Sequence, residues 1–368
     1  MMSIDSIFVY ILILLITLLL ISQSASRNQK KAKFFTFWGV LFFSVIIGCR
    51  WNVGVDYMTY YNFTIGNYVF DWELERFEPI PRYLAKWVSS TSAPFYLWFI
   101  GMAFIQIYFV QKALKKIFIP IVGWGIFLFL TMNLQEQMNI VRQGAAVCIC
   151  IYAFTYIKER NFIKYISFIL FASLVHKSAL LCIPIYFLGY YNFNLSVLSQ
   201  LSLLVIFSVV SSVVVNFLIQ KFANVAVSIG YEGALNTLNN NELNTKVGSG
   251  LGIIFNYLRY VILIMFYPKL RIIYDRYDFN FYYLLLFISI CSYSACFYSI
   301  YLQRLLIYFN YMNLIVFAFL LHYLYVRRYN VFYLFLLISL TGIQLFLYLW
   351  SGIPWEFIWN ARQLINFE

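Results

Sequence analysis

The chain alternates between apolar runs of 16 to 23 residues and short polar turns, many of them basic. Runs of this length match the roughly 20 residues that a helix needs to cross a bilayer. We therefore expect an all-α polytopic membrane protein, a single integral membrane domain over residues 1–368. The ten predicted transmembrane helices are residues 7–22, 34–49, 94–112, 117–133, 139–157, 197–219, 251–267, 279–299, 304–325 and 331–350.

The charges indicate how these helices are oriented. Basic turns follow or precede the runs at residues 27–33, 111–116, 158–164, 269–276 and 327–328. The positive-inside rule places all of them in the cytoplasm, with both termini and two long loops, residues 50–93 and 223–250, outside. The basic turns account for the whole net charge of +12, and the remaining charges balance. The excess is thus a topology signal, and we expect no nucleic-acid partner.

Residues 165–189 determine on which side of the membrane the later loops lie. The stretch leaves the cytoplasmic turn at residues 158–164 and must return to the same side if the segment 269–276 is also cytoplasmic. Twenty-five residues are too few for two crossings of about 20 residues each. We therefore predict two half-length helices or a re-entrant hairpin, with the sequence His-Lys-Ser (176–178) at its apex.

The six cysteines lie in or beside apolar segments without paired spacing, which favours packing over disulfides or zinc. No paired carboxylate motif is present for a divalent metal, so we expect neither a metal nor another cofactor.

Several ionisable residues lie where lipid would be. Helix rise measured from the basic turns places His176 and Arg259 about 18 and 15 Å into the membrane, and Arg142 and Arg304 near its outer face. Such residues are costly in lipid and usually line a cavity, so we interpret them as a site for an anion. Polar companions recur at helical spacing: Asn139 and Gln143 by Arg142, Asn256 by Arg259, and Tyr308 by Arg304.

The alternative is that each arginine is a structural clamp, which caps carbonyl groups or pairs with Glu136, Asp56 or Glu78. His322 lies close to a cytoplasmic turn, and we assign it no function.

Two features of the first outer loop add to the candidates. Arg50 and Asp56 are six residues apart with Gly54 between them, so the chain could fold back and bring guanidinium and carboxylate together. Glu78 precedes two prolines and an amphipathic segment that is typical of a membrane interface.

In combination, these residues resemble the EpsG and Wzy group of bacterial polysaccharide polymerases. The ordered pieces are Arg50 with VGxDYxxY (53–60), Glu78-Pro79, NIVRQGAA (139–146), FASLVHKSAL (171–180) and QRLLIYF (303–309). The resemblance implies a fold similar to the GT-C glycosyltransferases, in the bacterial inner membrane. Only the C-terminal SGIPWEFIWNARQLINFE matches loosely, which leaves its role open.

The resemblance also implies an activity, the joining of O-antigen or capsule repeat units on the periplasmic side. Donor and acceptor would both be carried on undecaprenyl pyrophosphate, and a chain-length regulator would be a possible protein partner. Arginines suit the charge that develops on the departing pyrophosphate, and a histidine or carboxylate could accept the acceptor's proton. The expected catalytic residues are His176, Arg142 and Asp56, and the expected substrate-binding residues are Arg50, Glu78, Asn139, Gln143, Lys177, Arg259, Arg304 and Tyr308.

His176 has three open interpretations: a general base, a hydrogen-bond partner of the pyrophosphate, or a tie between the apex and a neighbouring helix. Other functions also remain open. An O-antigen ligase or another lipid-sugar transferase would use the same arginine chemistry. A polysaccharide transporter or flippase would need polar lining through both leaflets. A structural scaffold would give Arg259 no reason to lie where it does.

Overall fold

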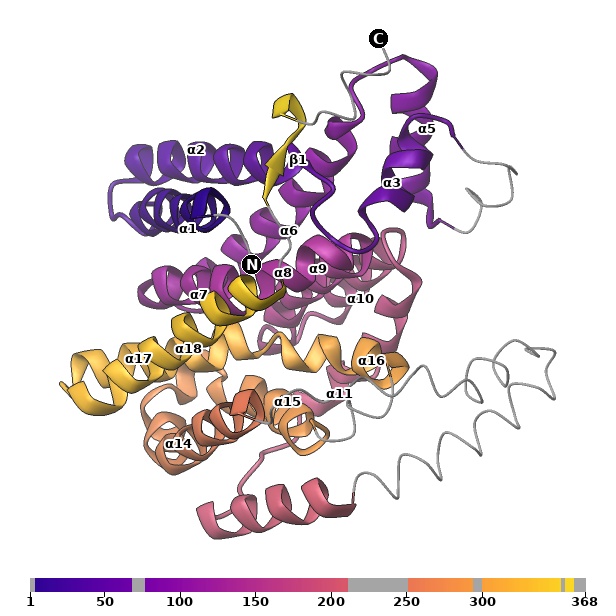
Figure 1. Cartoon of the computed structure of the whole chain (residues 1–368). Coiled ribbons are helices and arrows are strands. Elements are labelled where there is room, and N and C mark those ends of the chain that lie inside the picture. Colours follow the sequence, from indigo (N-terminus) through magenta and orange to yellow (C-terminus); the bar gives the residue numbers. More distant parts are fainter. Residues whose placement is uncertain (1–3, 68–76, 211–250, 294–299, 352–354, 361–368) are drawn as a thin grey trace. The chain divides into compact units, whose positions relative to one another are not determined.

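The computed structural model describes residues 4–67, 77–210, 251–293, 300–351 and 355–360, and these are almost wholly helical (Figure 1). The predicted loop at 223–250 lies outside these residues. Within them, five helices are long and apolar enough to cross a membrane: Ser6–Gln23, Gln29–Gly48, Tyr96–Ile117, Ile119–Asn139 and Gln303–Val326. The chain is therefore an all-α membrane protein. Large apolar side chains such as Phe8 (61% exposed) and Leu19 (64%) face outward along the first helix, as lipid contact requires.

The chain forms two compact units, Met1–Tyr190 with Phe317–Glu368 (unit 1) and Tyr191–Val316 (unit 2). Unit 1 contains α1 (Ile4–Gln23), α2 (Gln29–Gly48), β1 (Arg50–Trp51), α3 (Tyr57–Thr64), α5 (Pro79–Ser90), α6 (Tyr96–Ile117), η1 (Ile119–Ile121), α7 (Val122–Leu128), the π-helix η2 (Phe129–Asn133), α8 (Leu134–Asn139), α9 (Val141–Lys158), α10 (Phe162–Ser173), η3 (Lys177–Cys182), α11 (Ile185–Leu188), α18 (Asn330–Ser351), β2 (Glu356–Phe357) and η7 (Ile358–Asn360). Unit 2 contains the helix Val197–Val210, α14 (Leu251–Ile273), η5 (Asp275–Tyr277), α15 (Phe279–Cys291) and α16 (Ile300–Asn310). Helix α17 (Asn313–Val326) begins in unit 2 and continues in unit 1.

Helix α9 forms the centre of unit 1, where α6 and α10 pack against it. Every residue from Gln143 to Ile157 is buried, and the small residues Gly144, Ala145 and Ala146 let neighbouring segments approach the start of the helix closely. Gly144 shows the limit of this packing, since a Cβ atom there would lie 2.3 Å from Oε1 of Gln137 on α8. The central helix therefore has an apolar surface all round, as buried helices do.

The basic turns of unit 1 gather at one end, which we call the basic end (residues 24–36, 111–121, 158–164 and 322–333). Lys116 forms an ion pair with Glu159 at 2.9 Å. Nζ of Lys115 donates to Oγ1 of Thr36 at 2.6 Å. The ring of Phe118 packs against His322 at 5.4 Å. Segments that the positive-inside rule assigns to one side of the membrane thus lie together in the fold.

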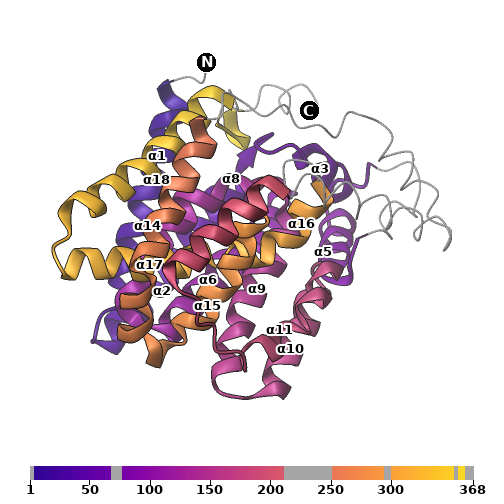
Figure 2. The same ribbon diagram turned by 90° about the horizontal axis from the view of Figure 1, so that it is seen from below.

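Residues 160–190 form a hairpin that returns to its starting point. Helix α10 is followed by η3, which packs against it, and by the short α11 (Figure 2). The rings of Phe162 and Tyr186 are 5.0 Å apart, and the Arg160 guanidinium is 3.9 Å from the Tyr190 ring centroid. The turn falls between Ser173 and Lys177, where we expect the apex. That this hairpin lies inside the membrane remains a prediction.

In unit 2, the residues after the hairpin bind the basic segment 269–276. Nη1 of Arg271 donates to Asn194, and its Nη2 donates to Oδ1 of Asn192 at 3.2 Å. Asn280 donates to the same oxygen at 3.1 Å. Residues 192–194 therefore lie at the same end of unit 2 as the basic segment, and the cytoplasmic location of that end stays a prediction. Residues 269–273 form the last turn of α14 rather than a loop, because that helix continues through Pro268.

Candidate functional site

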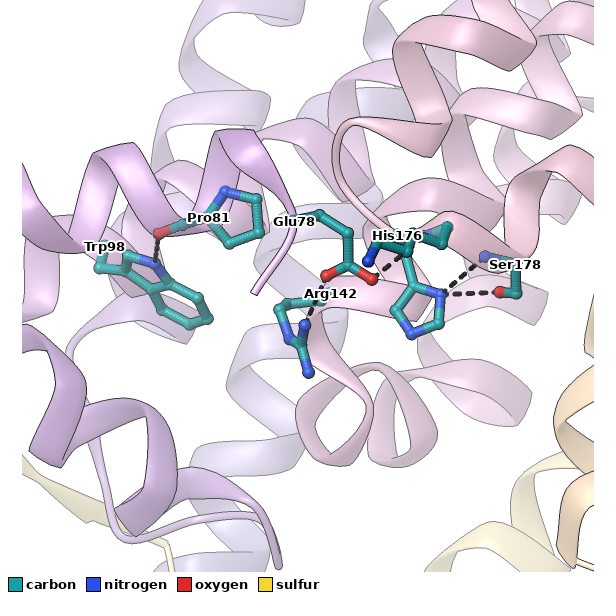
Figure 3. Close-up of polar contacts among 7 residues, drawn as sticks. Glu78, Pro81, Trp98, Arg142, His176 and Ser178 are labelled. Carbon is teal, nitrogen blue, oxygen red and sulfur yellow. Dashed lines mark hydrogen bonds and ion pairs between the residues drawn. The ribbon is translucent and has the colours of Figure 1, made fainter. Parts of the chain in front are cut away.

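Glu78 links three segments at the end of unit 1 opposite the basic end. Its Oε2 accepts from Nη1 of Arg142 at 2.5 Å, and its Oε1 accepts from the backbone N–H of Lys177 at 3.1 Å (Figure 3). The Glu78 side chain is 6% exposed. Its carboxylate therefore joins the start of α5, the start of α9 and the hairpin apex.

Arg142 keeps part of its hydrogen-bonding capacity. Its guanidinium lies over the Phe77 ring at 4.1 Å and near the Tyr60 ring at 5.7 Å. Among the residues described, its Nε has no hydrogen-bond partner. The side chain is 20% exposed, so the pair with Glu78 fixes the arginine without enclosing it. Burial raises the pKa of Tyr60, although the positive charge of Arg142 acts to lower it. The phenol therefore stays protonated at neutral pH.

His176 lies beside this pair at the first position of the apex. Its Nδ1 accepts from the backbone N–H of Ser178 at 3.3 Å and lies 2.7 Å from the Ser178 hydroxyl oxygen. Because Nδ1 accepts a bond from an amide, the neutral ring carries its proton on Nε2. Figure 3 shows the imidazole and the Arg142 guanidinium on the same side of the Glu78 carboxylate. The site thus presents two nitrogen donors toward one region.

Gln143 completes this cluster, since its Nε2 donates to Oγ of Ser178 at 3.4 Å. The structure therefore brings together five of the predicted residues, Glu78, Arg142, Gln143, His176 and Lys177. The Lys177 side chain is exposed, and only its backbone contacts Glu78.

Arg50 is a buried clamp on backbone carbonyls. Its side chain donates to the carbonyl oxygens of Ile47 (2.6 Å), Val53 (3.0 Å) and Met138 (3.3 Å), and the residue is 1% exposed. Burial lowers its pKa to about 10, which leaves it charged at neutral pH. The expected contact between Arg50 and Asp56 is wrong, because the three carbonyls take up the guanidinium. Arg50 therefore fixes the backbone of this loop through carbonyl groups rather than through Asp56.

Asn139 fixes the same loop to α8. Its Oδ1 accepts from the backbone N–H of Val55 at 3.0 Å. Gly54 allows this approach with a φ of 120°, and a Cβ atom there would lie 2.5 Å from the Met138 carbonyl oxygen. Asp56 follows at the start of α3, half-buried, and its carboxylate makes no hydrogen bond or ion pair with the residues that the structure describes.

Three predicted residues, Arg259, Arg304 and Tyr308, belong to unit 2. Arg259 on α14 is 5% exposed, whereas Arg304 on α16 is exposed and Tyr308, one turn later, is buried. The side-chain nitrogen of Asn256 donates to the Tyr293 hydroxyl at 2.7 Å. A common cavity for the three arginines remains a prediction.

Two contributors to the site, Ser178 and the backbone of Ile80, were not among the candidate residues predicted from the sequence. Ser178 bridges His176 and Gln143, and its place two residues after a histidine at a helix start is the signal that could have found it. The backbone N–H of Ile80 donates to the Leu174 carbonyl at 3.0 Å and joins α5 to the hairpin, a contact with no side-chain signal. Within the described ranges, no three His, Cys, Asp or Glu side chains gather as metal ligands.

Comparison with known proteins identifies one family. The model of the EpsG family matches residues 33–360, which include every candidate residue named above. No curated protein and no solved structure matches the chain.

Proposed function

Because the chain belongs to the EpsG family, we propose that it is a glycosyltransferase that polymerises lipid-linked oligosaccharide repeat units. The family supports a polysaccharide polymerase type of role, and the apolar helices support action in a membrane. In this proposal, donor and acceptor are carried on undecaprenyl pyrophosphate in the bacterial inner membrane. The reaction takes place on the periplasmic side, opposite the basic end.

The transfer breaks the bond between the anomeric carbon of the donor glycan and its pyrophosphate oxygen. A bond forms between that carbon and a hydroxyl oxygen of the acceptor unit, and the hydroxyl proton must leave. The pyrophosphate departs with the bonding electron pair, so negative charge grows on it in the transition state. Fixed donors that face the leaving oxygen stabilise this charge.

Arg142 supplies such a donor set, and this is the observation on which the proposal chiefly rests. A guanidinium is always charged and matches phosphate oxygens with its planar fork. Glu78 binds Nη1 and fixes the guanidinium, while the Arg142 side chain stays 20% exposed. We assign Glu78 to positioning Arg142, and Arg50 and Asn139 to fixing the loop beside it, rather than to direct contact with substrate.

We assign His176 the role of a second hydrogen-bond donor, whose Nε2–H is directed at the pyrophosphate. The bond that Nδ1 accepts supports this assignment over a general base, since a base needs a free lone pair on Nε2. Asp56 then becomes the candidate that removes the acceptor proton, because its half-buried carboxylate has no described partner. Arg259, Arg304 and Tyr308 are proposed to bind the second lipid-linked substrate.

The lipid-linked glycan of a deletion strain tests the function. A polymerase deletion should leave single repeat units and no polymer, and the wild-type gene should restore polymer. A deletion that leaves full-length polymer on its lipid carrier would refute polymerisation and favour a ligase. Arg142→Lys, Arg259→Lys and Arg304→Lys should each lower polymer at matched membrane abundance, whereas normal polymer from all three would refute the anion-binding role.

A further inference from the structure

Helix α5 presents one face to the protein and the opposite face to its surroundings. Ala85 and Val88 are buried. Tyr83, Lys86 and Trp87 recur at the spacing of one helix face and are exposed, with Tyr83 at 65% and Trp87 at 49%. Two large aromatic side chains and a cation therefore share an open face.

The neighbouring span gives the depth of this face. Nε1 of Trp98 donates to the Pro81 carbonyl at 3.0 Å, and Leu84 lies 3.1 Å from the position that a Cβ atom of Gly101 would occupy. Helix α6 begins at Tyr96, so Trp98 and Gly101 lie only about 3 and 7.5 Å along its axis from that end. The 22 residues of α6 span about 33 Å, close to the hydrocarbon thickness. Helix α5 thus borders the boundary of the hydrocarbon, where headgroups begin.

The charge of α5 matches the phosphates of such a layer. Arg82 and Lys86 are four residues apart, and residues 79–90 contain no acid. The acidic residue before the helix, Glu78, is already bound by Arg142. Tyr and Trp concentrate at this depth because their rings are apolar and their polar atoms reach water.

We propose that α5 binds the headgroup layer of the membrane, with Tyr83 and Trp87 between lipids and the two cations on lipid phosphates. Glu78 begins this helix, so the contact also holds Arg142 at headgroup depth. A pyrophosphate on a lipid anchor would meet the arginine there by lateral diffusion. The lipid contact itself is independent of the proposed function.

Fluorine NMR of the whole protein tests the contact. Protein labelled with 5-fluorotryptophan is placed in nanodiscs of phosphatidylcholine and phosphatidylglycerol, and its Trp87 resonance is assigned by its loss in Trp87→Phe. A nitroxide on the lipid headgroup should broaden this resonance more than a nitroxide at the end of the acyl chain or a water-soluble gadolinium chelate. Trp38, 45% exposed midway along α2 and assigned through Trp38→Phe, should show the opposite preference between the two nitroxides.

A second measurement tests the cations. Raising the phosphatidylglycerol fraction should shift the Trp87 resonance of the wild-type protein, and Arg82→Gln with Lys86→Gln should abolish that shift. Strongest broadening by the gadolinium chelate would place the face in water and overturn the proposal. A shift caused by soluble oligosaccharide, without broadening by lipid nitroxides, would overturn it in favour of a glycan-binding face. Polymer production does not enter either result, so this test and that of the proposed function can fail separately.

Discussion

Replacing His176 by asparagine and by glutamine separates the functions of its two ring nitrogens. An asparagine oxygen occupies nearly the position of Nδ1 and can accept from the Ser178 N–H, but it leaves the position of Nε2 empty. A glutamine amide reaches the position of Nε2 and can donate there, but it gives up the bond to Ser178. Alanine removes both interactions.

The expected magnitudes differ between the two functions. Loss of the helix-start bond should lower the free energy of unfolding by about 1 kcal/mol, as at other N-caps. Loss of a donor to a charged phosphate is worth about 1.5 to 3 kcal/mol, or roughly 10- to 150-fold in rate. We therefore expect His176→Asn to be stable and poorly active, His176→Gln to be less stable and substantially active, and His176→Ala to lose both properties.

Polymer amount and length on gels, at matched membrane abundance, measure activity, and thermal unfolding in detergent measures stability. His322→Ala, at the basic end, is the control and should make normal polymer. Equal loss of activity in the asparagine, glutamine and alanine variants would refute the donor assignment and indicate a general base. Normal polymer from the asparagine variant would leave His176 only its tie to Ser178.

Three further predictions concern the scaffold of the site. Arg142→Lys keeps a positive charge for Glu78 but loses the planar fork of the guanidinium. The amount of protein in the membrane should therefore stay unchanged while the amount of polymer falls about 10-fold or more. An unchanged amount of polymer would contradict a role for the planar fork. Gly54→Ala forces a side chain into a φ of 120° and against a carbonyl oxygen, which should lower the unfolding free energy by about 1 to 3 kcal/mol, measured by thermal unfolding. Ile358→Pro removes the N–H that donates to the Cys49 carbonyl at 3.1 Å and should reduce polymer, whereas Ile358→Val keeps the N–H and should not; identical polymer from both variants would make the contact irrelevant.

Much of the helical fold could be predicted because long apolar runs leave the backbone no alternative in lipid. The described spans Ser6–Gln23, Gln29–Gly48 and Tyr96–Ile117 largely follow predicted runs. Boundaries were less predictable, because a helix can extend beyond the hydrocarbon while its backbone bonds continue. Helix α14 does so, and it carries Lys269 and Arg271 on its last turns.

The candidate site was predictable as a set of residues, whereas of its contacts only the pairing of an arginine with Glu78 was among the alternatives. Arg142 and His176 could be identified because each is an ionisable residue in an apolar run. Such residues are costly in lipid and therefore usually have a function. The pairing of Arg142 with Glu78, 64 residues away, depends on how α5 and α9 each pack against α6. The short spacing allowed a contact between Arg50 and Asp56, yet the acceptors of the Arg50 guanidinium are carbonyls. Spacing in the sequence cannot show whether an arginine will bind a nearby carboxylate or a backbone carbonyl that tertiary packing brings closer.

The pairing of β1 with β2 imposes an order on biosynthesis. Arg50 and Trp51 pair with Phe357 and Glu356, and Trp355 donates its backbone N–H to Ser6 at 2.9 Å. The ribosome completes residue 358 about 15 to 60 s after residue 50, at roughly 5 to 20 residues per second. Until then, the backbone edge beside the arginine clamp lacks its partner strand, although α1 and α2 have already been synthesised. A translocon or chaperone that shields this edge would therefore act during translation, before the site can assemble.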